Sequence, residues 1–344
     1  MKKFIRLFVS FVMTVSFVSL SSTLVDASVG NYGLKPVYGD NQLGKSGFID
    51  IYGDPGSTHT IATTVINKDT KSHKYTANVY TGYTNNSGTL SFSSNSANDP
   101  SLKIKLRNIV QPKAQTVTVP AGGMVDVKFQ VQIPVQKFKG FLMGGIAVTP
   151  AKGEKTQTTV SSNGTLLKNK FVQGMGIVIR QDKNSKMQPN FKVRTVVPFA
   201  NATLKQRGVK ANLQNYVKGY NASIDAKATV TRRPDDHKFK KTATMSAISP
   251  APNSNFDYMI DWGKTPLQAG DYHLRIKLVS NDKTKSWVVN KDFTISDADA
   301  AKYNKLSGIK PNYMWLWILI AILVILLVLG LGIYFGRRNQ KNNN

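Results

Sequence analysis

The most constraining feature of the sequence is an uninterrupted apolar run close to the C-terminus, residues 314–335 (MWLWILIAILVILLVLGLGIYF). It contains no charge and no proline, and about 20 apolar residues in a helix are enough to cross the hydrocarbon core of a bilayer. No polar face interrupts the run, which argues against a core helix of a soluble domain. We therefore predict a transmembrane helix over 314–335.

The flanks of this run predict how the helix is anchored and oriented. Trp315, Trp317 and Tyr334 lie where aromatic side chains concentrate at the two membrane interfaces. Arg337 and Arg338 follow directly and open a polar tail over 336–344. Basic residues accumulate on the cytoplasmic side of a span, so we expect a basic cytoplasmic tail and a large extracellular part before the helix.

The N-terminus has the features of an export signal. Lys2, Lys3 and Arg6 precede an apolar segment, and residues 25–27 (VDA) resemble a small-residue cleavage site. We predict a signal peptide over 1–27 and a single-pass type I chain; an uncleaved N-terminal anchor is the alternative. The chain has no cysteine, so its exported domains must be stable without disulfides. With its Lys-, Asn-, Thr- and Ser-rich composition, this pattern indicates a Gram-positive cell-surface protein.

The extracellular part is strongly basic. The chain has 46 Lys and Arg against 19 Asp and Glu, a net charge of +27, and Glu154 is its one glutamate. Few of these cations lie in the predicted signal and tail, so the excess belongs to the part between them. Such a charge predicts anionic partners, namely anionic wall polymers or acidic proteins, and a merely solvated surface is the alternative. The basic residues are spread along the chain without a nucleic-acid-binding motif, so we expect no nucleic acid partner.

Apolar and polar residues alternate in several stretches before the C-terminal run. The clearest stretch is 125–133 (VDVKFQVQI), and 256–262 (FDYMIDW) and 272–278 (YHLRIKL) repeat the pattern. Period-two alternation places one face of a strand in a core and the other in water. Clusters rich in Asn, Asp, Pro and Gly separate the stretches, at 54–56, 85–88, 98–100 and 120–123. We therefore predict an all-β extracellular part.

The extracellular part is long enough for two ordinary domains. A polar stretch at 183–189 (KNSKMQP) divides the alternating segments into two groups. We predict two immunoglobulin-like β-sandwich domains, 28–183 and 187–296, followed by a stalk over 297–313. The polar segment 151–169 predicts a long loop, which is either a binding loop or disordered.

No catalytic constellation is recognisable. Histidines occur at 59, 73, 237 and 273, without the spacing that predicts a metal site. There is no serine in a nucleophile elbow, no cysteine nucleophile, no glycine-rich phosphate loop before a helix and no calcium-loop spacing of aspartates. We therefore predict no catalytic, metal or cofactor-binding residue and a chain that is not an enzyme.

Several short motifs resemble the WxL-interacting protein family of Gram-positive bacteria. They are 48–51 (FIDI) before Pro55-Gly56, a strand ending at Asn67, the Asn-rich turn in 81–88, 99–102 (DPSL), 119–122 (VPAG), Pro134, and 138–146 (FKGFLMGGI). The first domain resembles the family's peptidoglycan-binding domain and the second its host-binding domain. The chain departs from the family at 47–50, where a Tyr-Phe-Asp run is common, and at Leu90 and Phe92, where a Tyr usually follows the turn.

The resemblance implies binding rather than catalysis. It implies that the first domain binds peptidoglycan, that some surface binds secreted WxL-domain proteins, and that the second domain binds host matrix ligands. Our leading hypothesis is a non-enzymatic adhesion and scaffold protein, anchored in the membrane inside the wall. A glycan-modifying enzyme is the alternative, and it needs two carboxylates about 5–10 Å apart across a sugar. A tail over 336–344 is too short for a signalling domain. The resemblance assigns no ligand-binding residue, and the oligomeric state stays open.

Overall fold

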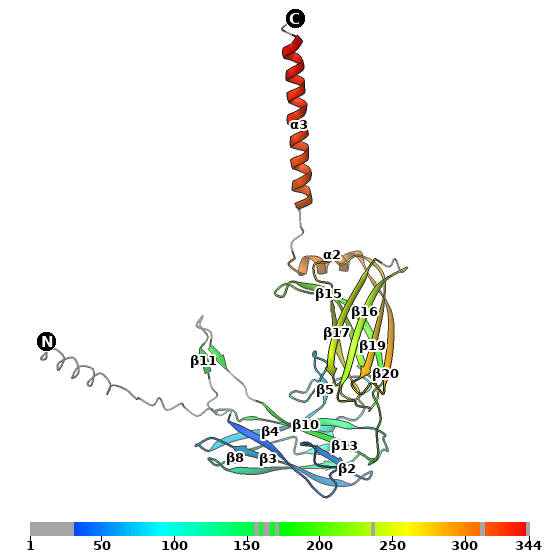
Figure 1. Cartoon of the computed structure of the whole chain (residues 1–344). Helices are drawn as coiled ribbons and strands as arrows, with labels where there is room; N and C mark the ends of the chain where they lie inside the picture. Colours follow the sequence, from blue (N-terminus) through cyan, green and yellow to red (C-terminus); the bar gives the residue numbers. More distant parts are fainter. Residues whose placement is uncertain are drawn as a thin grey trace, which may run out of the picture.

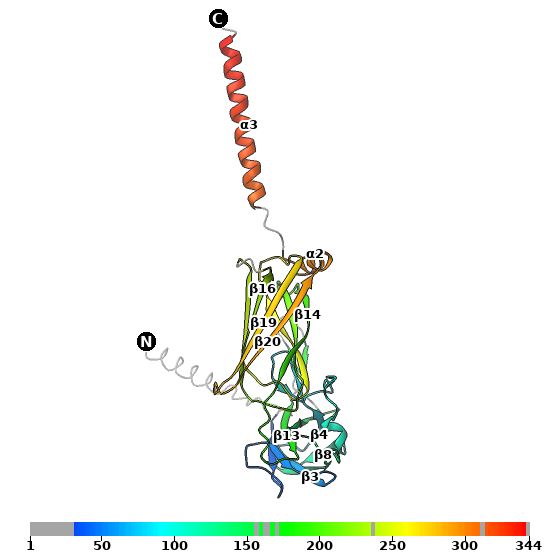
Figure 2. The ribbon, with the colours of Figure 1, turned by 90° about the vertical axis from the view of Figure 1, so that its right-hand side faces the viewer.

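A computed structural model describes residues 31–154, 158–160, 166–168, 172–234, 238–309 and 314–341, and no side chain within 155–171 or 334–341 or at Trp315. It shows two β-sandwich domains and a C-terminal helix, α3 (Met314–Lys341), which confirms the predicted fold class (Figure 1). The predicted signal peptide over 1–27 lies outside the described residues. Figure 2 shows the first domain beyond the end of the second domain that is far from α3.

The first domain consists of two facing sheets. One has the order β1-β3-β9-β7 and the other β2-β13-β10-β4-β8, and only the pair β13–β2 is parallel. The strands of the first sheet are β1 (Tyr32–Val37), β3 (Thr58–Asn67), β9 (Met124–Gln132) and β7 (Val110–Gln111). Those of the second are β2 (Ile49–Tyr52), β13 (Gln173–Arg180), β10 (Leu142–Pro150), β4 (His73–Thr81) and β8 (Ala114–Val119).

The first domain also contains smaller elements outside the two sheets. They are the hairpin β5 (Tyr83–Thr84) and β6 (Leu90–Ser91), a 3-10 turn η1 (Leu106–Ile109), and the hairpin β11 (Thr158–Val160) and β12 (Leu166–Lys168). The pair β11–β12 lies inside the segment 151–169 that the sequence predicts as a loop. This segment therefore contains a paired antiparallel ribbon.

The alternation of residues in the strands explains the core of the first domain. In β9, Val127, Phe129 and Val131 are fully buried, whereas Lys128 and Gln130 between them are exposed. Burial of each large apolar side chain contributes about 1.5–3 kcal/mol relative to leaving it in water, so the register of β9 is strongly specified.

Steric contacts explain why glycines occupy positions 145 in β10 and 174 in β13. Gly145 lies directly opposite Gly176, and the ring of Phe92 covers Gly145 and Gly174 on the outer face of the sheet. A Cβ atom on Gly145 would clash with this ring and lie 2.7 Å from the Met175 carbonyl oxygen. The glycines thus allow an aromatic side chain to lie flat on the sheet.

The second domain also consists of two sheets. One has the order β14-β15-β18 and the other β17-β16-β19-β20, all antiparallel. The strands are β14 (Phe191–Asn201), β15 (Gln206–Asn215), β18 (Ser254–Asp261), β17 (Lys240–Ile248), β16 (Ile224–Arg233), β19 (Gly270–Ser280) and β20 (Ser286–Ile295). Their core is aromatic: Trp262 and Tyr272 pack on one another with ring centroids 5.4 Å apart, and both contact Phe239.

The first half of the segment 297–313 is helical. Asp297–Leu306 forms helix α2, capped by Ser296, whose hydroxyl accepts a hydrogen bond from the Asp299 backbone N–H. Ala300 is buried against the second domain, and Asn304 exchanges two hydrogen bonds with the backbone of Leu267. This segment is therefore part of the second domain rather than a free tether.

Helix α3 contains the predicted span. Residues Leu316–Ile333 are long and apolar enough to cross a membrane, and none of them is buried against the protein. Trp317, one of the expected interface aromatics, is 69% exposed. The helical backbone continues through Arg337 and Arg338. The side chains of the other expected anchor residues, Trp315, Tyr334, Arg337 and Arg338, lie outside the described ones.

Candidate functional site

A polar groove lies in the first domain, with a volume of about 780 Å³. Three segments of the first domain and one residue after it form its walls. They are the loop 39–43 after β1, residues 52–54 at the end of β2, residues 58–60 at the start of β3, and Lys183. The groove is therefore built where β1, β2 and β3 come together, and no single stretch of sequence contains it.

Tyr52 lines the groove and has contacts to three other lining residues. Its backbone N–H donates to the Asn41 carbonyl oxygen at 3.1 Å, and the Asn41 side-chain amide donates to the Tyr52 carbonyl oxygen at 3.0 Å. These two bonds attach the loop after β1 to the end of β2. The Tyr52 hydroxyl donates to the Asp54 carboxylate, and this hydrogen bond raises the pKa of Tyr52 above its usual value. The Lys183 ammonium lies 4.7 Å from the centre of the Tyr52 ring.

His59 lines the opposite part of the groove. Its Nε2 atom lies 2.8 Å from the Ser57 hydroxyl. Gly53 makes room for it, because a Cβ atom at this position would lie 2.9 Å from that nitrogen. The lining thus offers an aromatic ring, carboxylates of Asp40 and Asp54, an ammonium, amides and hydroxyls. Such a mixed set of donors and acceptors suits a polar polymer, with sugar hydroxyls or peptide amides, rather than an apolar ligand.

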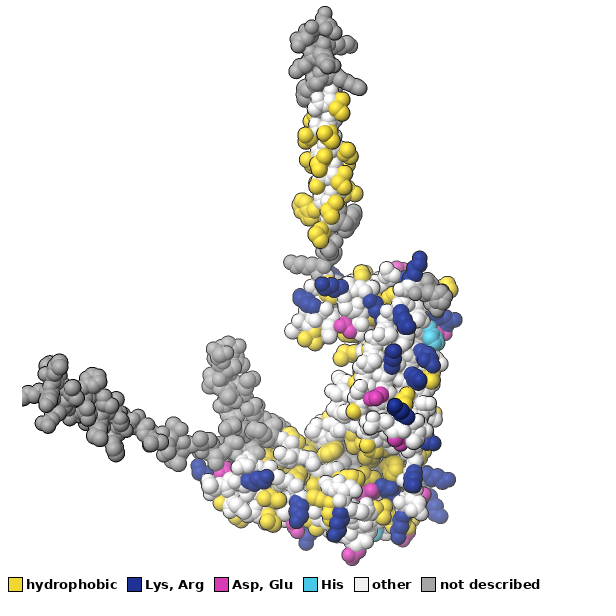
Figure 3. Space-filling model, in the orientation of Figure 1, with side chains coloured by type: hydrophobic (Ala, Val, Ile, Leu, Met, Phe, Trp, Pro, Cys, Tyr) yellow, Lys and Arg dark blue, Asp and Glu magenta, His cyan; other side chains and the backbone are white. Residues whose placement is uncertain are grey.

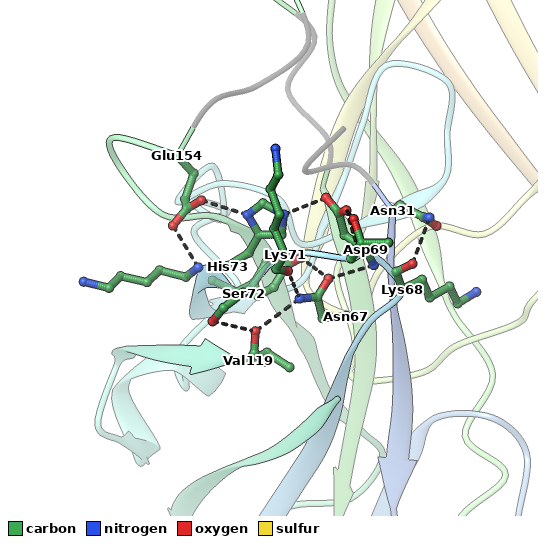
Figure 4. Close-up of polar contacts among 12 residues, drawn as sticks. Asn31, Asn67, Lys68, Asp69, Lys71, Ser72, His73, Val119 and Glu154 are labelled. Atoms are coloured by element: carbon green, nitrogen blue, oxygen red, sulfur yellow. Dashed lines mark hydrogen bonds and ion pairs between the residues drawn. The ribbon is translucent and has the colours of Figure 1, made fainter. Parts of the chain in front are cut away.

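A second polar cluster surrounds His73 at the start of β4 (Figure 4). Its Nε2 atom lies 2.7 Å from an Asp69 carboxylate oxygen, and its Nδ1 atom lies 3.0 Å from a Glu154 carboxylate oxygen. Carboxylates only accept hydrogen bonds, so both contacts are satisfied only when both ring nitrogens carry protons. The geometry therefore fits an imidazolium held between two carboxylates.

The charges of this cluster shift its titration. Burial lowers the pKa of His73, but the hydrogen bonds and charges of Glu154 and Asp69 outweigh this, and the pKa lies above its usual value. The hydrogen bond with His73 lowers the pKa of Asp69. Burial raises the pKa of Glu154, and the bonds from His73 and the Lys74 backbone N–H more than compensate, so it lies below its usual value.

The cluster has a structural role. The buried Asn67 side chain donates to the carbonyl oxygens of Lys71, Val119 and Pro120, at 2.8, 3.1 and 3.0 Å. Together with His73, these bonds connect the turn between β3 and β4 to the end of β8 and to Glu154 after β10. The cluster thus closes one end of the first sandwich.

Asp99 joins the two domains. Its side chain is only 5% exposed and accepts hydrogen bonds from the Ser101 backbone N–H at 2.8 Å and the Gln214 amide at 2.6 Å. The Asn255 amide also donates to it. Burial raises the pKa of Asp99, but these donors outweigh the effect and hold its pKa below the usual value. Gln214 and Asn255 belong to β15 and β18, so a carboxylate of the first domain organises the sheet surface of the second.

Backbone contacts reinforce this junction. The Thr84 N–H donates to the Ser254 hydroxyl at 2.7 Å, and the Ala251 N–H donates to the Thr84 hydroxyl at 3.0 Å. On the other side, the Phe141 N–H donates to the Lys218 carbonyl oxygen at 2.8 Å. Hydrogen bonds at several separate points favour one relative orientation of the domains.

The positions considered for catalysis or metal binding are not assembled into one site. His59 lies in the groove, His73 in the cluster with Asp69 and Glu154, and His273 beside Asp292 at 2.6 Å. His237 lies outside the described residues. No group of three or more His, Cys, Asp or Glu side chains among those described is arranged to hold a metal ion.

Comparisons with known proteins match both domains. Residues 32–150 match the model of the WxL Interacting Protein peptidoglycan binding domain, and residues 162–305 match that of the WxL Interacting Protein host binding domain. No curated protein sequence matches the chain.

Three of the solved structures with a similar arrangement are fimbrial or pilus chaperones. The class 5 fimbriae chaperone CfaA is 14% identical, with a TM-score of 0.31, over 76% of this chain and 99% of that one. The CsuC–CsuE pre-assembly complex of Acinetobacter baumannii is 12% identical, with a TM-score of 0.34, over 70% and 93%. The Pseudomonas aeruginosa CupB2 chaperone is 12% identical, with a TM-score of 0.26, over 71% and 96%. These similarities are too weak to bear on function.

Proposed function

The chain belongs to the WxL-interacting protein family, and we propose that it is a non-enzymatic, membrane-anchored protein whose first domain holds peptidoglycan in the groove around Tyr52. Its two family domains support a cell-surface binding protein. We assign peptidoglycan binding to the groove because it is a sizeable polar hollow whose lining lies mostly within the matched range 32–150.

The chemistry of the groove fits the polymer. Peptidoglycan presents sugar rings with hydroxyl and amide groups, and short peptides that carry both carboxylate and amine groups. The Tyr52 ring offers an aromatic surface, Asn41 and Asp54 offer polar partners, and Lys183 offers a cation for a peptide carboxylate. Lys183 follows the range 32–150 and lies inside the range 162–305 that matches the host binding domain, so the site draws on residues outside the peptidoglycan binding match.

Sedimentation with insoluble peptidoglycan tests the proposal. We expect the full-length chain in neutral detergent to sediment at moderate salt and Tyr52→Ala to sediment less. Tyr80→Ala is the matched control, because Tyr80 lies on the outer face of the same domain, beneath Arg107. Equal sedimentation of the two variants contradicts the groove assignment. A wild-type chain that fails to sediment at low and moderate salt contradicts wall binding itself.

One observation keeps the enzymatic alternative testable. Asp40 and Asp54 both line the groove, and hydrolysis of a glycan uses a pair of carboxylates. If the protein only binds, prolonged incubation with peptidoglycan releases no soluble fragments. Release that is lost in Asp54→Asn would establish catalysis.

Membrane anchoring is the second part of the proposal. We place α3 across the cell membrane with its C-terminal end in the cytoplasm, because Arg337 and Arg338 follow the apolar span. Deletion of residues 314–344 should release the protein from membranes while part of it stays with the wall. Complete loss to the medium would argue against wall retention.

The remaining partners follow from the family. We propose that one surface binds secreted WxL-domain proteins and that the second domain binds host matrix ligands. Pull-down with purified WxL-domain proteins encoded beside this chain tests the first. Binding of the full-length chain to immobilised matrix proteins, with and without a substituted second-domain surface, tests the other.

A further inference from the structure

Three cations lie together on the outer face of the sheet β17-β16-β19-β20. Lys227 on β16 is directly opposite Lys277 on β19, and Arg275 is two residues along β19 on the same face. All three are exposed, while the residues that alternate with them, such as Ala228 and Ile276, are fully buried. Figure 3 shows Lys and Arg side chains gathered along this part of the second domain, where the sheet faces the viewer.

This arrangement is unfavourable for the isolated fold. Side chains directly opposite on neighbouring strands have Cβ atoms about 4.5–5.5 Å apart, and like charges at such positions destabilise a sheet. The described part of the chain contains no ion pair or hydrogen bond to the side chains of Lys227, Arg275 or Lys277. The acidic residues at the ends of the sheet have other partners: Asp225 accepts from the Ala247 N–H at 3.0 Å, and Asp292 pairs with Arg233 and His273.

One cation elsewhere in the same domain has a carboxylate partner. Lys210 on the other sheet lies 2.8 Å from the Asp257 carboxylate. Around Lys227, Arg275 and Lys277, most neighbouring cross-strand positions carry hydrogen-bonding groups without charge: Thr229, Thr242, Thr244 and Asn290. The exception is Val288, which lies opposite Lys277 and is 48% exposed. Cations with hydroxyls and an amide beside them on an exposed sheet face form a surface suited to an extended anion.

We infer that this face binds a linear polyphosphodiester of the cell envelope, a polyol chain with one phosphate in each repeat. Arg275 and Lys277 are separated by two strand residues, about 7 Å, so successive charges of an extended polymer can meet successive cations. Lysine is a common point-charge ligand of phosphate. At most seven residues separate α2 from α3, a reach of about 25 Å, so a membrane-inserted α3 keeps this domain within reach of polymers at the membrane face of the wall.

Binding of full-length protein in neutral detergent to immobilised synthetic poly(glycerol phosphate) tests the inference. At about 0.15 M salt, where the Debye length is about 8 Å, we expect Lys227→Gln/Lys277→Gln to lose about tenfold or more in affinity. The control is Lys103→Gln/Lys105→Gln in the first domain, which removes the same charge from two exposed lysines that are close together in the sequence and should lose much less.

Lys277→Gln alone adds a readout that a structural role would not produce. It relieves the like-charge pair, so its Tm should stay equal to or rise above that of the wild type while binding weakens. Equal losses of affinity in the two double variants would mean that binding depends only on net charge, and this would overturn the inference. Absence of wild-type binding would also overturn it, as would tighter binding of heparin through the same residues, which would identify a sulfated glycan instead. The groove around Tyr52 contributes to none of these measurements, so peptidoglycan binding and this inference succeed or fail separately.

Discussion

Replacement of Asp99 by alanine should uncouple the two domains. The carboxylate accepts hydrogen bonds from Gln214 and Asn255 of the second domain and from Ser101 of its own loop. The Gln214 side chain is already short of one partner, since no hydrogen bond reaches its buried Oε1 atom within the described residues. Removal of Asp99 leaves the amides of Gln214 and Asn255 without their acceptor, and each buried orphan donor costs about 1–3 kcal/mol. With two such donors, we expect a loss of about 2–6 kcal/mol in the free energy that couples the domains.

The assay is unfolding by urea of the full-length chain in neutral detergent. Trp262 and Trp287 report on the second domain, and circular dichroism reports on both domains. Wild-type transitions should coincide, and those of Asp99→Ala should separate. Asp126→Ala is the control, because this exposed carboxylate accepts from Thr64 within the first domain. Coincident transitions in Asp99→Ala, with a midpoint like that of Asp126→Ala, would refute the coupling role.

The pH dependence of the same junction has a definite sign. The pKa of Asp99 is lower in the folded chain than its usual value of 3.8. A lowered folded pKa contributes stability above the unfolded pKa and loses it as pH falls through the folded value. The difference in stability between wild type and Asp99→Ala should therefore be full at neutral pH and shrink below about pH 4.

Three further substitutions probe other parts of the fold. His73→Gln should remove a contribution to stability that exists below the unfolded pKa of His and disappears as pH rises through the raised folded value, so urea midpoints of wild type and variant should converge toward alkaline pH. Gly145→Val should destabilise the first domain by about 2–4 kcal/mol, because the side chain would collide with Phe92 and the Met175 carbonyl oxygen, and an unchanged Tm would contradict this packing. Asn304→Ala should weaken the packing of α2 by about 1–3 kcal/mol, through loss of its hydrogen bonds with the Leu267 backbone, and should expose residues 297–309 to limited proteolysis.

The local sequence pattern predicts most of the fold of this chain but few of the residue contacts that form its sites. The alternation at 125–133 predicts β9 and its inward residues because strand periodicity is a local property. Helix α2 is short, its buried residue is Ala300, and Tyr303 and Asn304 are half-buried, so its sequence has no strong apolar stripe. Tertiary contacts with Leu267 and Arg207 hold it in place instead.

The sites depend on pairs of residues that are far apart in the sequence, so sequence spacing does not predict them. His73 and Glu154 are 81 residues apart, and Asp99 and Asn255 are 156 apart. The sequence shows that Glu154 is the one glutamate of the chain, but it does not show that His73 is its partner. The groove draws on residues between 39 and 60 and on Lys183, and only the sheet order brings them together.

The packed junction and the docked helix α2 determine where the proposed binding surfaces can reach. With α2 attached to the second domain, at most seven residues, about 25 Å, remain between this domain and α3. The first domain lies beyond the end of the second that is far from α2 (Figures 1 and 2), so the Tyr52 groove belongs to the domain that is more distant from the membrane helix. If the bonds of Asp99 held the domains only loosely, the groove could fold back toward the membrane, and wall binding would place no tension on the anchor. A junction with one preferred orientation instead gives the two proposed attachments, α3 in the membrane and the groove in the wall, a spacing that the protein itself sets.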